Sequence, residues 1–166
     1  LVMMNGVAPA RAKENTLKFS SDEEAASQEG HKGTFHGHED DVLAVVFLPD
    51  GKFMVTASVD GTARVWNTET MKLHTVLKGH RKGILNITTA GNGRFIITAS
   101  ADGTARVWDS ETWKCVATLW GHTKEVRLLC ITPDGKFLIT AGADLEARVW
   151  RTDTWKRVAV LTGHEG

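Results

Sequence analysis

Short apolar blocks alternate with polar turns along most of the chain, and the first complete set runs from residue 42 to residue 77. The set predicts four strands: Val42–Leu48, Phe53–Ala57, Thr62–Trp66 and Leu73–Leu77. The first block is continuously apolar, as is typical of a strand buried on both faces. The Asp60-Gly61 step between the second and third strands is a strong hairpin signal. Turn signals every 8–12 residues indicate an all-β meander.

The same order of blocks returns with a step of 42 residues. A Gly-His dipeptide keeps this step at four positions, beginning at Gly37, Gly79, Gly121 and Gly163. Asp and Trp keep the same step, at Asp60, Asp102 and Asp144 and at Trp66, Trp108 and Trp150. Residues 56–66 recur as residues 98–108 with a single change, Val59 to Ala101. We therefore predict repeats at 37–78, 79–120 and 121–162, and the start of a fourth at 163–166.

A Gly-His pair, about two dozen residues, an Asp and then a Trp, in a unit of about 42 residues, resembles the WD40 repeat. The resemblance runs from Gly37 to His164, although only Trp108-Asp109 spells the dipeptide that names the family. It implies an all-β fold: a β-propeller segment of three four-stranded antiparallel blades, part of a propeller of about seven blades. Three blades alone would leave two apolar faces in water. The chain is therefore expected to be part of a longer propeller or to close with other copies.

The resemblance also implies a structural tetrad of hydrogen-bonded side chains in each repeat. Its members would be His38, Ser58, Asp60 and Trp66 in the first repeat, His80, Ser100, Asp102 and Trp108 in the second, and His122, Asp144 and Trp150 in the third. In the third repeat Gly142 stands in place of the serine, and Leu145 and Glu146 replace a Gly-Thr pair. We expect this tetrad to lack its hydroxyl and the third blade to be weaker.

Members of this family commonly bind partners on the top face of the propeller, through three positions in each blade. Here those positions are Asp41, Leu43, Val59, Gly83, Leu85, Ala101, Glu125, Arg127 and Ala143. Most of these residues are apolar in the first two repeats, and the set also contains two acids, Asp41 and Glu125, and one arginine, Arg127. This mixture favours a peptide with an apolar anchor and a basic flank. The alternative is that they only line a solvated rim.

Composition narrows the function classes. Twenty Lys and Arg balance twenty Asp and Glu, which disfavours nucleic acid because phosphate binding needs excess positive charge. Two cysteines, Cys115 and Cys130, fit a reducing compartment, and both fall on predicted strands as small core residues. The longest apolar run has seven residues, far below the roughly 20 that cross a membrane. These observations predict an intracellular protein, cytoplasmic or nuclear, with no membrane contact.

The sequence gives little support for catalysis or for metal binding. His, Asp and Ser recur together in two repeats, which suggests nucleophilic catalysis, but a nucleophile would be needed once and not once per repeat. His31, His36 and His38 could ligate zinc, yet no second cluster supplies a fourth ligand. We predict no enzymatic activity, no cofactor and no metal.

Several features remain open between two interpretations. Residues 1–36 resemble a linker or tail, with a possible outer strand near 33–35 because Phe35 is in phase with Leu77. The recurring Arg64, Arg106 and Arg148 form either a basic stripe or strand residues lying over a blade. Trp113, Trp120 and Trp155 are either contact residues or packing residues.

The predicted function is that of a non-catalytic scaffold for protein–protein interaction, whose partners are proteins or peptides. One alternative is a reader of nucleic acid or chromatin peptides. The other is a recruitment module of a larger enzyme. A fold alone does not choose among these functions.

Overall fold

The computed structural model describes residues 35–163 of the chain. These residues form three four-stranded antiparallel sheets, which confirms the predicted fold class of an all-β protein with three blades. The strands are β1 (Val42–Phe47), β2 (Phe53–Ser58), β3 (Ala63–Asn67), β4 (Leu73–Leu77), β5 (Ile84–Ala90), β6 (Phe95–Ser100), β7 (Ala105–Asp109), β8 (Cys115–Leu119), β9 (Val126–Ile131), β10 (Phe137–Gly142), β11 (Ala147–Arg151) and β12 (Arg157–Leu161). Within the described part of the chain there is no helix that could span a membrane.

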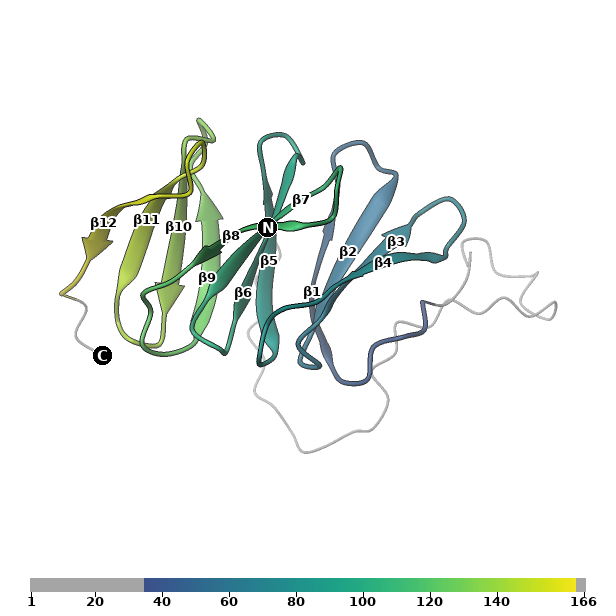
Figure 1. The fold of residues 1–166 in the computed structure, drawn as a ribbon, viewed down its shortest axis with the longest axis horizontal. Helices are drawn as coiled ribbons and strands as arrows, with labels where there is room; N and C mark the ends of the chain where they lie inside the picture. Colours follow the sequence, from purple (N-terminus) through teal and green to yellow (C-terminus); the bar gives the residue numbers. More distant parts are fainter. Residues whose placement is uncertain (1–34, 164–166) are drawn as a thin grey trace.

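The three sheets stand side by side in chain order, as Figure 1 shows. We call them blade 1 (β1–β4), blade 2 (β5–β8) and blade 3 (β9–β12); each is a simple meander. The first strand of a blade packs against the blade before it, because β5 contacts β1 and β2, and β9 contacts β5 and β6. The blades are thus stacked. The first strand of blade 2 or blade 3 is part of its own sheet and also packs against the blade before it.

The apolar core lies between blades. One cluster joins Val55, Ala63, Val65 and Leu77 of blade 1 to Ile87, Ile96 and Trp108 of blade 2. A second joins Ile97, Ala105, Val107 and Leu119 of blade 2 to Leu129, Leu138 and Trp150 of blade 3. In each cluster, the surface that the earlier blade contributes is called its trailing face. The surface that the later blade contributes is called its leading face. Each interface therefore pairs one trailing face with one leading face.

Two tryptophans extend these interfaces at the outer turns. Trp113 precedes β8, and its ring lies 5.2 Å from Phe53 and 5.3 Å from His74, both in blade 1. Trp155 of blade 3 lies 5.2 Å from Phe95 of blade 2. Edge-to-face contacts at such distances stabilise aromatic pairs. Trp113 and Trp155 are therefore packing residues that join neighbouring blades.

The turn between the second and third strands needs a residue with a left-handed backbone. Gly61 and Gly103 hold this place with φ of 81° and 83°. In blade 3 it is held by Leu145 with φ of 65°, a conformation that costs an L-residue about 1–2 kcal/mol. The turn survives the loss of its glycine, but it carries backbone strain.

Two burial predictions were wrong. The run Val42–Leu48 was expected to be buried on both faces, yet in β1 only alternate residues are shielded, and Leu43, Val45 and Phe47 are 48%, 49% and 59% exposed. Cys115 and Cys130 were expected in the core, and both are exposed. Cys115 lies on the outer strand β8, and Cys130 on the first strand of the last described blade, where no further blade covers it.

Candidate partner-binding rim

A hydrogen-bonded chain of side chains runs through each blade below its rim. In blade 1 the His38 Nδ1 lies 2.7 Å from Asp60 Oδ2, and its Nε2 lies 2.8 Å from Thr56 Oγ1. The Trp66 indole N–H donates to the same threonine oxygen at 2.8 Å. Since an ionised carboxylate can only accept, Nδ1 carries the proton and the hydroxyl donates to Nε2. The two rings, the hydroxyl and the carboxylate are thereby held in one orientation.

The hydroxyl in these networks comes from threonine, so the prediction that Ser58 and Ser100 supply it was wrong. Thr98 takes the same place in blade 2, 2.8 Å from His80 Nε2, and accepts from Trp108 at 2.9 Å. The Ser58 hydroxyl instead donates to the Asp40 carbonyl and accepts from the backbone N–H of Asp60, both at 3.1 Å. The serine therefore fixes the turn that carries the aspartate.

Blade 3 has a complete network, contrary to the expectation that Gly142 removes the hydroxyl. Thr140 Oγ1 lies 2.9 Å from His122 Nε2 and accepts from the Trp150 indole at 3.0 Å. Asp144 accepts from His122 Nδ1 at 2.9 Å and from Arg148 at 3.1 Å. The third repeat therefore keeps the His–Asp, His–Thr and Trp–Thr hydrogen bonds and adds an ion pair, but Gly142 cannot make the turn bonds of Ser58.

The carboxylates in these networks are held ionised. Burial by itself would raise the pKa of Asp60, but hydrogen bonds from Thr62, His38 and two backbone N–H groups lower it from 3.8 to about 2. Asp102 is also lowered to a pKa of about 2 by the equivalent donors, against the opposing effect of burial. Burial would also raise the pKa of Asp144, but hydrogen bonds from His122, the Thr123 backbone N–H and Arg148 hold it far below its usual range. Burial lowers the pKa of His80 below 6.5, against the attraction of Asp102.

Above the networks, each first strand contains a β-bulge at its start. The ladder pairs Val42 with Ser58 and Ala44 with Ala57, and it passes over Leu43. Leu85 is passed over in β5 and Arg127 in β9. A bulge redirects the side chain of the unpaired residue. Three of the nine predicted partner-binding positions are therefore residues that the ladder leaves out.

The other six predicted positions form backbone pairs beside the bulges. The N–H of Val59 donates to the carbonyl of Asp41 at 2.9 Å. Ala101 donates to Gly83 at 3.0 Å, and Ala143 to Glu125 at 2.9 Å. The structure thus brings the three positions of each blade together at one end of the sheet. We call the nine residues the rim.

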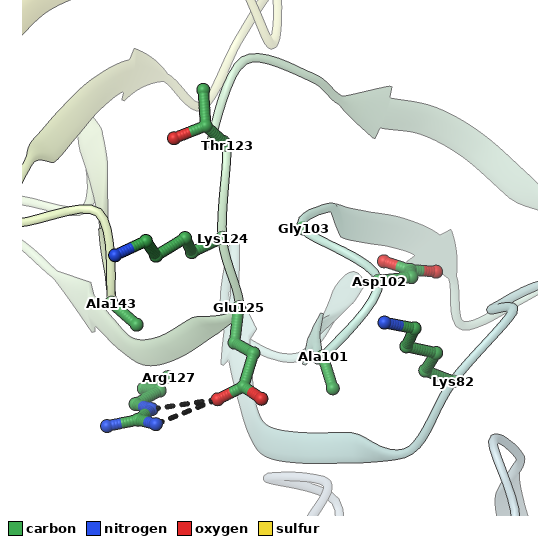
Figure 2. Close-up of a pocket in the computed structure, with 9 residues that line it drawn as sticks. All are labelled: Lys82, Ala101, Asp102, Gly103, Thr123, Lys124, Glu125, Arg127 and Ala143. Carbon is green, nitrogen blue, oxygen red and sulfur yellow. Dashed lines mark hydrogen bonds and ion pairs between the residues drawn. The ribbon is translucent and has the colours of Figure 1, made fainter.

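A hollow of about 390 Å³ opens at the rim between blades 2 and 3 (Figure 2). Its lining consists of Lys82, Ala101, Asp102, Gly103, Thr123, Lys124, Glu125, Arg127 and Ala143. Four of these are rim residues, and the five remaining rim residues, Asp41, Leu43, Val59, Gly83 and Leu85, lie outside it. The rim is therefore hollowed at the junction of blades 2 and 3.

Only some of the charged side chains in the hollow have an ion-pair partner. Glu125 accepts from Arg127 at 2.9 and 3.1 Å, and the two side chains face each other in Figure 2. Lys82 and Lys124 form no ion pair with any other described residue. Both lysines were missed from the sequence, although they and Asp40 share one place in the 42-residue repeat. Comparing the repeats at that place would have found them.

The loops above the rim change sign from one blade to the next. Blade 1 presents Glu39, Asp40 and Asp41, all charged and exposed, whereas blade 2 presents exposed Arg81 and Lys82. A ligand that lay along the rim would meet an acidic region first and a basic region next.

The recurring arginines serve as packing residues. An added Cβ on Gly37 would lie 2.5 Å from Arg64 Nη1, and one on Gly79 would lie 2.6 Å from Arg106 Nη1. Each guanidinium therefore lies against the glycine of a Gly-His pair, and a side chain at that glycine would have to displace it. Arg148 is 5% exposed and pairs with Asp144 and Glu146. This arrangement supports the interpretation as strand residues lying over a blade.

The histidine cluster and the N-terminal strand are only partly described. His31 and residues 33–34 lie outside the described residues, and Phe35 is not part of a strand. Within residues 35–163 no group of three or more His, Cys, Asp or Glu is placed to hold a metal ion. Trp120, the third tryptophan singled out, is 62% exposed.

Comparison with known proteins gives consistent results. The family profile described as "WD domain, G-beta repeat" matches residues 29–67, 71–109 and 113–151, well over half of the chain. A guanine nucleotide-binding protein subunit beta from Zea mays is 54% identical over 37 residues, which are 22% of this chain and 10% of that protein. The target of rapamycin complex subunit wat1 from Schizosaccharomyces pombe is 50% identical over 34 residues, 20% of this chain and 11% of its own. The matched segments thus span about a tenth of these relatives.

Two solved structures, described as "Structure of U3-55K" and "Crystal structure of RRP9 WD40 repeats", superpose with TM-scores of 0.75 at 20% identity. The likeness covers 79% of this chain and 42% and 41% of those chains. At this identity it shows the fold.

Proposed function

This chain belongs to the WD40 repeat family, and from that membership we propose that it is a non-catalytic scaffold that binds protein or peptide partners along its rim. The observation that carries the proposal is the bulge at the start of each first strand. It sets Leu43, Leu85 and Arg127 outside the ladder, and Arg127 also lines the hollow between blades 2 and 3. A side chain outside the ladder can contact a partner without loss of sheet hydrogen bonds.

The networks below the rim support a rigid platform. Asp60, Asp102 and Asp144 each hold a turn and a histidine at once, so the loops above them are fixed before a partner arrives. Pre-ordered loops lose little conformational entropy on binding. These side chains are occupied by one another, which fits a structural role and supports a scaffold over an enzyme.

The partner that fits this rim is an extended peptide with an apolar anchor and charges of both signs. Leu43 and Leu85 offer apolar contact, Asp40 and Asp41 suit a basic flank, and the unpaired lysines of the hollow suit an acidic flank. The basic flank is the one expected from the sequence. The acidic flank is added by Lys82 and Lys124. Two exposed thiols, Cys115 and Cys130, agree with a reducing compartment, cytoplasm or nucleus.

A peptide selection tests the proposal. A library of random peptides is selected on the immobilised chain, and the best binder is measured by calorimetry against the wild type and two variants. Leu85→Glu and the double change Lys82→Glu with Lys124→Glu should each weaken binding at least about tenfold, because an interface centre tolerates no new repulsion. Lys114→Glu, the same reversal at an exposed outer turn of blade 2, should leave binding unchanged.

Two results would contradict the proposal of a scaffold that binds along its rim. Equal affinity for the wild type and the rim variants would place the contact surface elsewhere. Binding that disappears when nuclease is added would support the alternative of a nucleic-acid reader.

A further inference from the structure

The recurring arginine of the third strand has anionic partners in blade 3 and none in blades 1 and 2. In blade 3 the Arg148 guanidinium pairs with the carboxylates of Glu146 and Asp144. The equivalent residues of the other blades, Arg64 and Arg106, form no ion pair with any other described residue. The structure therefore contains the same arginine both with and without its anion.

The difference comes from the residue two places before the arginine. Glu146 of blade 3 is replaced by Thr62 in blade 1 and by Thr104 in blade 2. The Thr62 hydroxyl donates to Asp60 Oδ1 at 2.7 Å. The threonine thus satisfies the neighbouring aspartate but offers no carboxylate to Arg64, whose guanidinium keeps its donors for another acceptor.

The Arg64 guanidinium lines a hollow of about 330 Å³, between the β2–β3 turn and the start of the loop from β4 to β5. We call it the Arg64 hollow. Its lining consists of Glu39, Asp60, Gly61, Thr62, Arg64, Lys78, Gly79 and His80. None of these residues belongs to the rim or to the hollow between blades 2 and 3. The Arg64 hollow is therefore a separate feature of the surface.

Lys78 gives the Arg64 hollow a second cation. It is exposed, and within residues 35–163 it has no ion-pair partner. Trp120 holds the same place in blade 2 and Thr162 holds it in blade 3, so of the three described blades only blade 1 joins the arginine to a lysine. His80 adds no charge near pH 7, because burial lowers its pKa below 6.5.

The two acids of the lining differ in how far they are already bonded. Asp60 accepts from His38, from the backbone N–H of Glu39 and from both donors of Thr62. The Glu39 side chain is exposed and forms no ion pair with the rest of the described chain. Two unpaired cations thus stand against one unpaired carboxylate, and Glu39 is an internal competitor for them.

The accessibility of Arg64 belongs to its place in the repeat. Arg106 holds this place in blade 2 and is likewise only partly buried, although blade 1 packs against blade 2. Both guanidinium groups lie against the glycine of a Gly-His pair. Packing of a neighbouring blade therefore leaves this guanidinium within reach of a ligand.

We infer that the Arg64 hollow binds a carboxylate side chain from an acidic segment of a protein partner. Guanidinium and carboxylate groups match in a bidentate geometry, and Glu146 pairs with the equivalent arginine in blade 3. A phosphate dianion fits less well, because its larger charge would face Glu39 and Asp60. This contact is independent of the function assigned to the rim.

Nuclear magnetic resonance of the 166-residue chain tests the contact. The buried Nε–H of Arg64 provides a signal close to the bound group, and Arg64→Lys assigns it. The probe is a short peptide with blocked ends, Gly-Ser-Glu-Glu-Ser-Gly, and its control has Gln in place of both Glu. The acidic peptide should move the Arg64 signal and saturate with a dissociation constant of about 1–10 mM, in the range of one or two charge-assisted bonds. The Gln peptide should leave the signal in place.

Three variants of the lining test its separate roles. Lys78→Gln should weaken binding about threefold, whereas Lys72→Gln, the same change at an exposed position before β4, should not affect it. Glu39→Gln removes the internal competitor and should strengthen binding about threefold. Thr62→Glu supplies the carboxylate that blade 3 already has and should abolish binding. Circular dichroism checks the fold of each variant, and the first two changes lie at exposed side chains.

Four results would overturn the inference. An Arg64 signal that stays in place, or that moves equally with the Gln peptide, excludes the site. Inorganic phosphate that binds as tightly as the peptide excludes the choice of a carboxylate. Weaker binding in Glu39→Gln contradicts the competition. A shift that is lost in Leu85→Glu but kept in Lys78→Gln would place the peptide on the rim and not in the Arg64 hollow.

Discussion

The indole N–H of Trp150 donates to the hydroxyl of Thr140 at 3.0 Å, in the blade whose sequence departs most from the other two. The same hydroxyl lies 2.9 Å from His122 Nε2. Thr140 is fully buried, so neither ring could find water in its place. The two residues give the third blade the same Trp–Thr–His hydrogen bonds as the other two blades.

The first prediction concerns this threonine. Thr140→Val keeps the shape of the side chain but leaves the Trp150 indole N–H and His122 Nε2 without a partner, which should lower the free energy of unfolding by about 1–3 kcal/mol. Thr98→Val in blade 2 should cost a similar amount, and Thr140→Ser should restore most of the loss. Chemical denaturation measures all three. A neutral Thr140→Val would show that the hydroxyl does not stabilise the blade.

The strands, their order and the repeat were predictable because turn residues and apolar blocks recur at a constant step. The choice between Thr56 and Ser58 was not, because residues two apart in a strand point to the same side of the sheet. Along the sequence, the two hydroxyls have similar separations from the histidine and from the aspartate. The pairing of Met54 with Trp66 across β2 and β3 sets which hydroxyl lies nearer the indole, and spacing alone does not supply that register.

The candidate site was likewise only partly predictable from the sequence. The rim positions follow from the repeat, but the hollow depends on how blade 2 packs against blade 3. Lys82 and Lys124 enter it from loops of different blades. The exposure of Cys130 and Val45 likewise depends on which faces are covered, which a single strand pattern does not reveal.

The second prediction concerns the strained turn of blade 3. Leu145→Gly removes a side chain that is 53% exposed and frees a backbone with φ of 65°. Relief of about 1–2 kcal/mol should exceed the entropy that glycine loses on folding. We expect the melting temperature to rise by a few degrees. Leu145→Ala keeps the strain and serves as the control; a rise of equal size there would refute the explanation.

The third prediction compares two tryptophans. Trp155→Ala removes the contact with Phe95 between blades 2 and 3 and should cost about 2–3 kcal/mol, below the loss at a fully buried ring. Trp120→Ala, at a 62% exposed ring, should stay within about 0.5 kcal/mol. Urea unfolding of both variants measures the difference. Equal losses would mean that the inter-blade contact adds nothing.

The fourth prediction concerns pH. The pKa of His80 is lowered below 6.5 in the folded chain, so the unfolded chain binds the proton more readily, and stability is lost as pH falls below about 6.5. Asp60 and Asp102 have pKa values of about 2 against 3.8. Their contribution is complete above 3.8 and is lost as pH falls towards about 2. Thermal melting between about pH 8 and 2 should therefore show two successive declines.

The variant that separates the two declines is His80→Gln. It removes the upper decline, below about pH 6.5, and leaves the lower one in place. A melting temperature that rises as the wild type is acidified through pH 6 would contradict the assignment.

The bulge at the start of each first strand separates side-chain identity from strand register. Leu43, Leu85 and Arg127 occupy one structural place with different chemistry, while their neighbours Val42, Ile84 and Val126 stay β-branched and aliphatic. A residue that the ladder omits can be exchanged without moving any strand. These three codons could therefore be randomised together in a combinatorial library, and most members should still fold, which makes the arc a starting point for engineered affinity reagents.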